Sequence, residues 1–97
     1  MDPVRVTKIC RTVLLRLRGR ESQFIEAKIN EVAEKMEILE RGLKWAIGDG
    51  DKDRESEIQA KIENLNESFE KFRYKSQIII ETYDNIIQVL TRRILKK

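Results

Sequence analysis

The 97-residue sequence contains no histidine, one cysteine and one proline. Without histidine, the chain lacks the usual general base near neutral pH and the commonest metal ligand. The lone thiol of Cys10 excludes an internal disulfide. Apolar runs such as Ile78–Ile80 are far shorter than the roughly 20 residues of a membrane-spanning helix. We therefore expect no enzyme, cofactor or metal site and no membrane insertion, and we expect a cytoplasmic location.

Apolar residues recur at alternating spacings of three and four, which is the pattern of a coiled-coil seam. Two rows show this pattern: Ile25, Ile29, Val32, Met36, Leu39, Leu43 and Ala46, then Ile58, Ile62, Leu65, Phe69, Phe72, Ser76, Ile79, Tyr83, Ile86 and Leu90. Between the rows, residues 48–53 contain two glycines and three aspartates, which predict a turn. The sequence thus predicts an all-α fold, a long antiparallel helical hairpin or coiled coil, as a single domain over residues 1–97.

Local signals set the expected ends of the helices. Asp2 is a good cap and Pro3 suits the first helical position, so one helix should span about 3–47. Gly48 and Gly50 would end it, and a turn over 48–53 follows. Asp53 is the expected cap of a second helix over about 54–95.

The first helix has an irregular beginning. Its N-terminal row is Val6, Cys10, Val13 and Leu17, and eight residues rather than seven separate Leu17 from Ile25. Either the helix continues through Gly19 with a local change of supercoil, or it breaks near Gly19 and the fold is a three-helix bundle. The continuous helix is favoured because its length matches that of the second helix. On the row, Cys10 is expected to be buried.

Charge is unevenly distributed along the chain. Residues 1–20 have a formal net charge of +5, residues 21–72 of −6 and residues 73–97 of +4. In an antiparallel hairpin the two basic segments meet. Extra apolar residues next to the rows there require a further neighbour, either a second copy or a partner protein. These residues are Ile9, Leu14, Leu15, Ile78, Ile80, Ile87, Val89 and Leu95.

Other candidate sites have simple structural explanations. Asp49, Asp51 and Asp53 resemble the start of a calcium loop, but Arg54 and Ala60 stand where that loop needs Gly and Glu. The arginines near the N-terminus could contact phosphates, but no zinc motif, glycine-rich loop or aromatic platform accompanies them. A solvated basic face, or a docking face for an acidic protein, is favoured over nucleic acid or a membrane surface.

Residues spread over about 2–90 resemble the tubulin-binding cofactor A family. The matching residues are Asp2-Pro3, Arg11-Thr12, Leu14-Leu15-Arg16, Arg20-Glu21 and Glu26, then Glu57-Ile58, Leu65, Glu67-Ser68, Tyr83, Val89 and Leu90. The chain departs from the family in having Ile25 in place of a tyrosine, no proline in residues 71–74, and no third helix.

The resemblance implies a tubulin-folding chaperone that binds β-tubulin folding intermediates through helix surfaces, without catalysis. The partner-binding residues it implies are Arg11, Thr12, Arg16, Arg20, Glu21, Glu26, Glu67 and Ser68. Two alternatives stay open on the sequence alone. One is a homodimeric coiled-coil scaffold or assembly protein, and the other is a nucleic-acid binder that uses its basic end.

Overall fold

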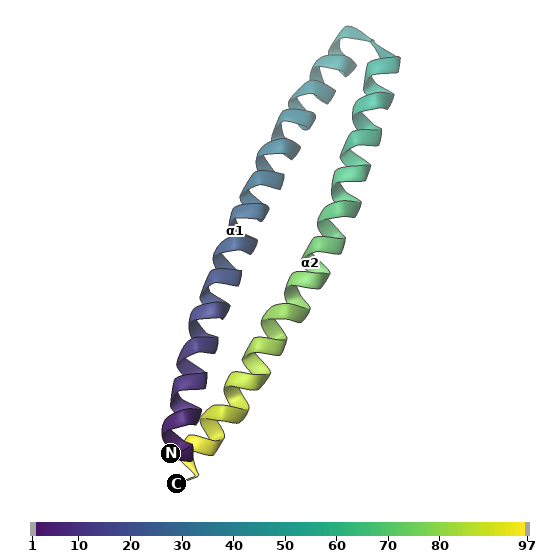
Figure 1. The fold of residues 1–97 in the computed structure, drawn as a ribbon. Coiled ribbons are helices and arrows are strands. Elements are labelled where there is room, and N and C mark those ends of the chain that lie inside the picture. The colour runs from purple at the N-terminus through teal and green to yellow at the C-terminus, as the bar shows by residue number, and fades with distance from the viewer. Residues whose placement is uncertain (1, 97) are drawn as a thin grey trace. The chain divides into compact units, whose positions relative to one another are not determined.

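The computed structural model describes residues 2–96, which form two α-helices and no strand. Helix α1 spans Pro3–Asp49 and helix α2 spans Lys52–Leu95, joined by a turn at Gly50 and Asp51 (Figure 1). The predicted all-α helical hairpin is therefore confirmed. The chain divides into two compact units. Unit 1 comprises Met1–Ile25 with Lys75–Lys97, and unit 2 comprises Glu26–Tyr74.

Helix α1 begins where the sequence predicts and continues without interruption through Gly19. The carboxylate of Asp2 accepts a hydrogen bond from the amide of Val4 at 3.0 Å, and its carbonyl accepts one from Val6. Asp2 is thus the N-terminal cap, and Pro3 occupies the first helical position. Because α1 is unbroken, the alternative of a three-helix bundle with a break near Gly19 is wrong.

A glycine at positive φ ends α1. Gly50 has φ of 71°, its amide donates to the carbonyl of Ile47, and the amide of Asp51 donates to the carbonyl of Ala46 at 3.0 Å. These two bonds form the Schellman motif, in which the residue after the helix adopts the left-handed conformation that favours glycine. Gly48 stays within the helix at negative φ and does not take part in the stop.

Helix α2 begins two residues earlier than predicted because its cap is Asp51. The Asp51 carboxylate accepts a hydrogen bond from the amide of Arg54, three residues on, at 3.2 Å. Asp53 instead lies in the first turn with Glu55, where negative side chains favour the positive end of the helix. The sequence prediction chose the wrong member of three closely spaced aspartates.

Unit 2 holds most of the tightly packed apolar residues. Ala46 and Ile58 are buried, with 1% and 8% of their surfaces exposed. A Cβ added at Gly42 would lie 3.4 Å from Cδ1 of Ile58, so α1 and α2 approach closely at this level. The predicted row residues that are partly shielded here are Val32, Met36, Leu39, Leu43, Ile62, Leu65, Phe69 and Phe72. Ile29 is a correction, because it is 43% exposed while its neighbour Lys28 is partly shielded.

In unit 1 the two helices pair through a different stripe from the predicted one. The shielded residues, which we call the inner seam, are Val4, Thr7, Arg11, Leu14, Arg18, Ser22 and Ile25 of α1 and Ser76, Ile80, Tyr83, Ile87, Leu90 and Ile94 of α2. The predicted positions Ile79 and Ile86 are 42% and 43% exposed. Cys10, expected to be buried, is exposed.

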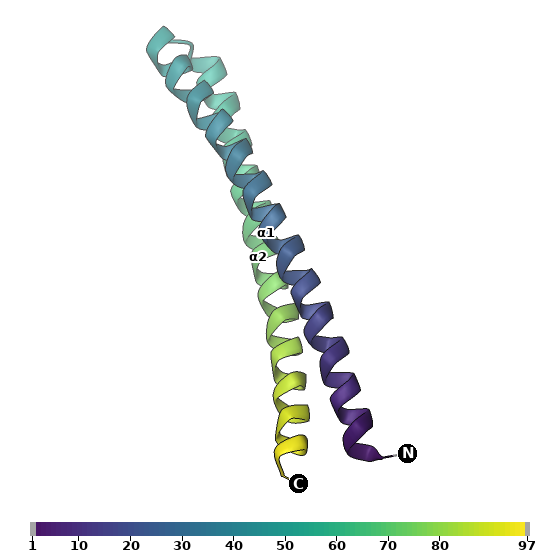
Figure 2. The same cartoon turned by 90° about the vertical axis from the view of Figure 1, so that its left-hand side faces the viewer.

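The inner seam of unit 1 contains polar residues that bond across the helix pair. The guanidinium Nε of Arg11 donates to the hydroxyl of Thr91 at 2.9 Å, and Arg18 pairs with the carboxylate of Asp84. Moving from Arg11 to Arg18 along α1 leads backward from Thr91 to Asp84 along α2, so the segments are antiparallel. Figures 1 and 2 show them side by side in both views.

We predict that seam residues of α2 matter more for stability than their neighbours. Replacing Ile80 or Ile87 by alanine should cost about 1–2 kcal/mol each, because partly shielded methylenes lose their packing. The same change at Ile79 or Ile86 should cost well under 1 kcal/mol. Urea unfolding followed by circular dichroism measures the difference, and equal losses at all four positions would contradict the inner seam.

The two glycines near the turn should respond oppositely to alanine. Gly50→Ala places a Cβ at φ of 71° and should destabilise the fold by about 1 kcal/mol. Gly48→Ala introduces a better helix former where nothing lies within 4 Å, and should stabilise by up to about 1 kcal/mol. Thermal melts of the matched pair give the test. A loss of stability in Gly48→Ala would show that Gly48 also belongs to the stop.

Candidate interaction surface

Unit 1 exposes a second row of apolar side chains on each helix. We call these residues the outer surface: Val6, Cys10, Val13 and Leu17 of α1 with Ile79, Ile86 and Val89 of α2. Their exposed fractions include 47% for Val13 and 46% for Val89. The α1 row follows the three-and-four spacing of a helix that packs against a neighbour, and the α2 row has the same spacing except that the exposed Thr82 stands at one of its steps. The described part of unit 1 contains no such neighbour.

The two rows lie on the same side of the helix pair. At about 100° of rotation per residue, each row is displaced from its own inner seam by roughly 100°. On both helices, a residue of the outer surface comes one position before a residue of the inner seam, as Val13 comes before Leu14 and Ile86 before Ile87. Because α2 runs antiparallel to α1, the same sense of rotation turns both rows to one common face of unit 1. The outer surface is therefore one continuous apolar face built from two helices.

The interhelical polar contacts lie toward the opposite side of unit 1. Thr91 and Asp84 of α2 are displaced from the inner seam in the sense opposite to Ile79 and Ile86. Arg11 and Arg18 reach them from α1. The acid Asp84 is thus held by Arg18 away from the outer surface. The Arg11–Thr91 and Arg18–Asp84 contacts thus lie on one side of the helix pair, and the outer surface lies on the other.

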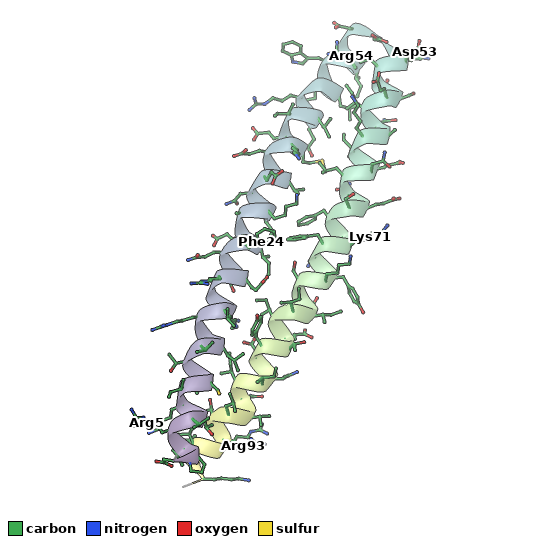
Figure 3. The ribbon with its side chains drawn as sticks, in the orientation of Figure 1. Arg5, Phe24, Asp53, Arg54, Lys71 and Arg93 are labelled. Carbon is green, nitrogen blue, oxygen red and sulfur yellow. The ribbon has the colours of Figure 1, made fainter. Side chains whose placement is uncertain are left out.

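Basic residues surround the outer surface. Unit 1 contains eleven Lys or Arg and four Asp or Glu, a formal net charge of +7. Lys75 and Arg93 continue the α2 row at its two ends, and Arg20 follows Leu17 on α1. Figure 3 shows Arg5 and Arg93 at the end of unit 1 where the chain begins. An acidic partner would therefore be attracted to this face.

The predicted partner-binding residues are divided between the units. In unit 1, Arg16, Arg20 and Thr12 are exposed, and Glu21 is partly shielded. The hydroxyl of Thr12 donates to the carbonyl of Lys8 at 3.0 Å. Arg11 is partly shielded, and its Nε donates to the hydroxyl of Thr91, so it helps to pair the helices. Its role in partner binding stays a prediction.

The remaining predicted residues, Glu26, Glu67 and Ser68, are exposed in unit 2. Ser68 lies on the rim of a shallow groove between α1 and α2, lined by Lys35, Ile38, Leu39, Lys61, Asn64, Leu65 and Ser68. Ile38 is 67% exposed and Trp45 is 74% exposed on α1 beside it. Trp45 and Ile38 also line a smaller hollow with Arg41 and Gly42. Unit 2 therefore has an apolar surface of its own.

The sequence prediction missed the inner seam of unit 1 because that seam is partly polar. Counting backward from Ile25 in alternating steps of four and three leads through Glu21, Arg18, Leu14 and Arg11 without an irregularity. This regular spacing was a usable signal. It competed with the more apolar row of Val6, Cys10, Val13 and Leu17, which the structure leaves exposed.

A cluster of metal-ligating side chains, three or more His, Cys, Asp or Glu placed to hold a metal ion, is absent from residues 2–96, the part of the chain that the structure describes. Asp53 and Arg54 lie beside the turn of unit 2 (Figure 3). Within the same range, neither helix has an uncharged apolar stretch long enough to cross a bilayer.

One carboxylate has a displaced pKa. A hydrogen bond from the Lys35 ammonium group, 3.0 Å away, lowers the pKa of Glu31, and the charge of Lys28 acts in the same direction. These are exposed pairs along α1 in unit 2, three and four residues apart. They support the helix locally.

Comparisons with known proteins identify no relative of this chain. No protein-family model, no curated protein and no solved structure matches it.

We predict that Lys35→Met raises the pKa of Glu31 measured by NMR titration, because the main hydrogen bond to its carboxylate is lost. The pKa of Glu31 is lowered by folding. Its contribution to stability is therefore complete above the unfolded-state pKa and disappears as the pH falls through the folded-state pKa. A matched Lys44→Met variant should leave Glu31 unchanged. An unaltered titration in Lys35→Met would contradict the assigned cause.

Proposed function

We propose that this chain is a non-catalytic helical protein that binds another protein through the surfaces of unit 1. The observation that supports this function is the outer surface, a continuous apolar face on two helices. Exposed apolar faces of this kind, rimmed by polar residues, are typical of protein interaction sites. The described residues form helices and no sheet edge, so a helix surface is the natural binding element.

The resemblance described above indicates a specific partner. We propose that the chain is a tubulin-folding chaperone of the cytoplasm that binds β-tubulin folding intermediates. Residues Arg16 and Arg20 are exposed in unit 1, and Glu67 and Ser68 are exposed in unit 2, where they are free to meet a partner. The resembled family has a third helix, whereas the described residues 2–96 form two. In this proposal a segment of the client covers the outer surface.

A second function is favoured by the same apolar face. A homodimeric coiled-coil scaffold would cover the outer surface with a second copy, and this would produce a four-helix arrangement. Sedimentation velocity over a range of protein concentrations and salt distinguishes the two functions. A scaffold should stay dimeric at high salt, because apolar contacts are not screened. A chaperone of the first kind should sediment as a monomer.

We predict that the wild-type chain shifts β-tubulin released from chaperonin on a native gel, and does not shift the intact αβ-tubulin dimer. Arg16→Glu with Arg20→Glu should weaken this binding about tenfold or more, because two exposed cations become anions without a change in helix packing. Lys44→Glu with Lys71→Glu, the same charge change on exposed positions of unit 2, should have a much smaller effect.

Two results would count against the tubulin partner. Absence of any shift, with a normal helical spectrum and cooperative unfolding, would remove β-tubulin and leave the scaffold function. An equal loss of binding in both double variants would mean that net charge alone, and not the basic face of unit 1, governs the interaction.

A further inference from the structure

We propose that the outer surface of unit 1 binds a single amphipathic helix with acidic flanks, contributed by a different protein. This inference deepens the proposed function and rests on it. It specifies which face binds, which secondary structure occupies that face, and which charge the occupant has.

The geometry of the outer surface fits a helix. The bonds from Arg11 to Thr91 and from Arg18 to Asp84 set the register of unit 1, in which residues facing one another have numbers that sum to about 102. In this register Val13 is level with Val89 and Leu17 is nearly level with Ile86. Ile79 extends the apolar face beyond Leu17, so the face covers about 17 residues of helix, or roughly 25 Å.

The two apolar rows lie side by side from the level of Val13 and Val89 to that of Leu17 and Ile86, so the side chains of a third helix can pack between them. The α1 row alone continues through Cys10 to Val6, and the α2 row alone continues past the exposed Thr82 to Ile79. Both rows keep the phase of an α-helix, which lets them accept a helical neighbour. An extended strand would instead need an exposed sheet edge for its backbone groups, and unit 1 offers only helices. The occupant is therefore a helix of about five turns, with apolar residues recurring at three and four.

The charge of the occupant follows from the charged residues around the outer surface. Arg20, Lys75 and Arg93 continue the apolar rows, whereas Glu21 is partly shielded in α1 and the Asp2 carboxylate is engaged in capping that helix. Asp84 is bonded to Arg18 on the far side of the pair. A second copy of unit 1, with its formal net charge of +7, would bring like charges together across this face. A helix with acidic flanks gains attraction at the same positions.

Two synthetic helical peptides test the proposal directly. Both carry leucine at the three-and-four positions over about 18 residues. One has glutamate at most other positions, and the other has lysine. Fluorescence anisotropy with the full chain should give at least tenfold tighter binding of the glutamate peptide, and added salt should weaken that preference.

Variants then locate the binding site. Val13→Ser with Ile86→Ser should weaken glutamate-peptide binding at least tenfold and leave the helical spectrum intact, since both side chains are exposed. The matched control, Ile38→Ser with Trp45→Ser, removes exposed apolar side chains from unit 2 and should have no effect. Lys75→Glu with Arg93→Glu lowers the formal net charge of unit 1 from +7 to +3 and should reduce the preference for the glutamate peptide.

Several results would overturn the proposal. Equal affinity for both peptides would remove the charge argument, and loss of binding in the unit 2 control would move the site. If the chain is a dimer that Val13→Ser with Ile86→Ser dissociates, a second copy occupies the face. Peptide binding without any shift of β-tubulin would keep the surface and overturn only the named partner. If the double variant Val13→Ser with Ile86→Ser still shifts β-tubulin, β-tubulin remains the partner and the outer surface is not its binding site.

Discussion

A pair of helices can bury only the stripe that each turns toward the other, and this limit governs unit 1. The chain has more apolar residues there than one stripe can hold, so one set must remain in contact with solvent. The inner seam contains Thr7, Arg11 and Arg18, and the outer surface contains the valines, Leu17 and the exposed isoleucines. Arg11 and Arg18 are tolerated in the seam because they bond across it, to Thr91 and Asp84, and the Thr7 hydroxyl donates to the carbonyl of Pro3 within α1. Partly exposed polar contacts such as the Arg18–Asp84 ion pair add little stability. Their value lies in fixing the register of two helices whose apolar residues would fit more than one pairing.

The same limit explains which parts of the fold could be predicted from the sequence. The helices, their antiparallel order and the glycine turn follow from spacing and capping residues that have few alternatives. In unit 2 the row from Ile58 to Phe72 has a single apolar residue at each step, and these positions are shielded as expected. In unit 1 the sequence Ile78-Ile79-Ile80 and the pair Ile86-Ile87 satisfy two registers one residue apart. Periodicity cannot decide between them, and the contacts of Arg11 and Arg18 do.

The inner seam of α2 differs from the predicted row only at alternate positions. Ser76, Tyr83 and Leu90 belong to both, and the seam passes from Ser76 to Ile80 in four residues where the predicted row passes to Ile79 in three. Ile80 and Ile87 therefore take the shielded places that were predicted for Ile79 and Ile86. The candidate site therefore depends on which residues of each helix turn toward the other helix. A search of the sequence for apolar residues would find the residues of the site but would not show that they lie on one exposed face.

The position of Cys10 makes its thiol a natural probe of the outer surface. It is the only thiol in the chain, it is exposed, and it lies within the outer surface between Val6 and Val13. A fluorophore or spin label attached to it would stand on the proposed binding face without any engineered substitution. Burial of that thiol by an arriving protein would slow its alkylation, so chemical reactivity at one atom reports occupancy of the face. In an oxidising solution the same atom would join two copies covalently, and a reductant is therefore needed to keep the face open to other proteins.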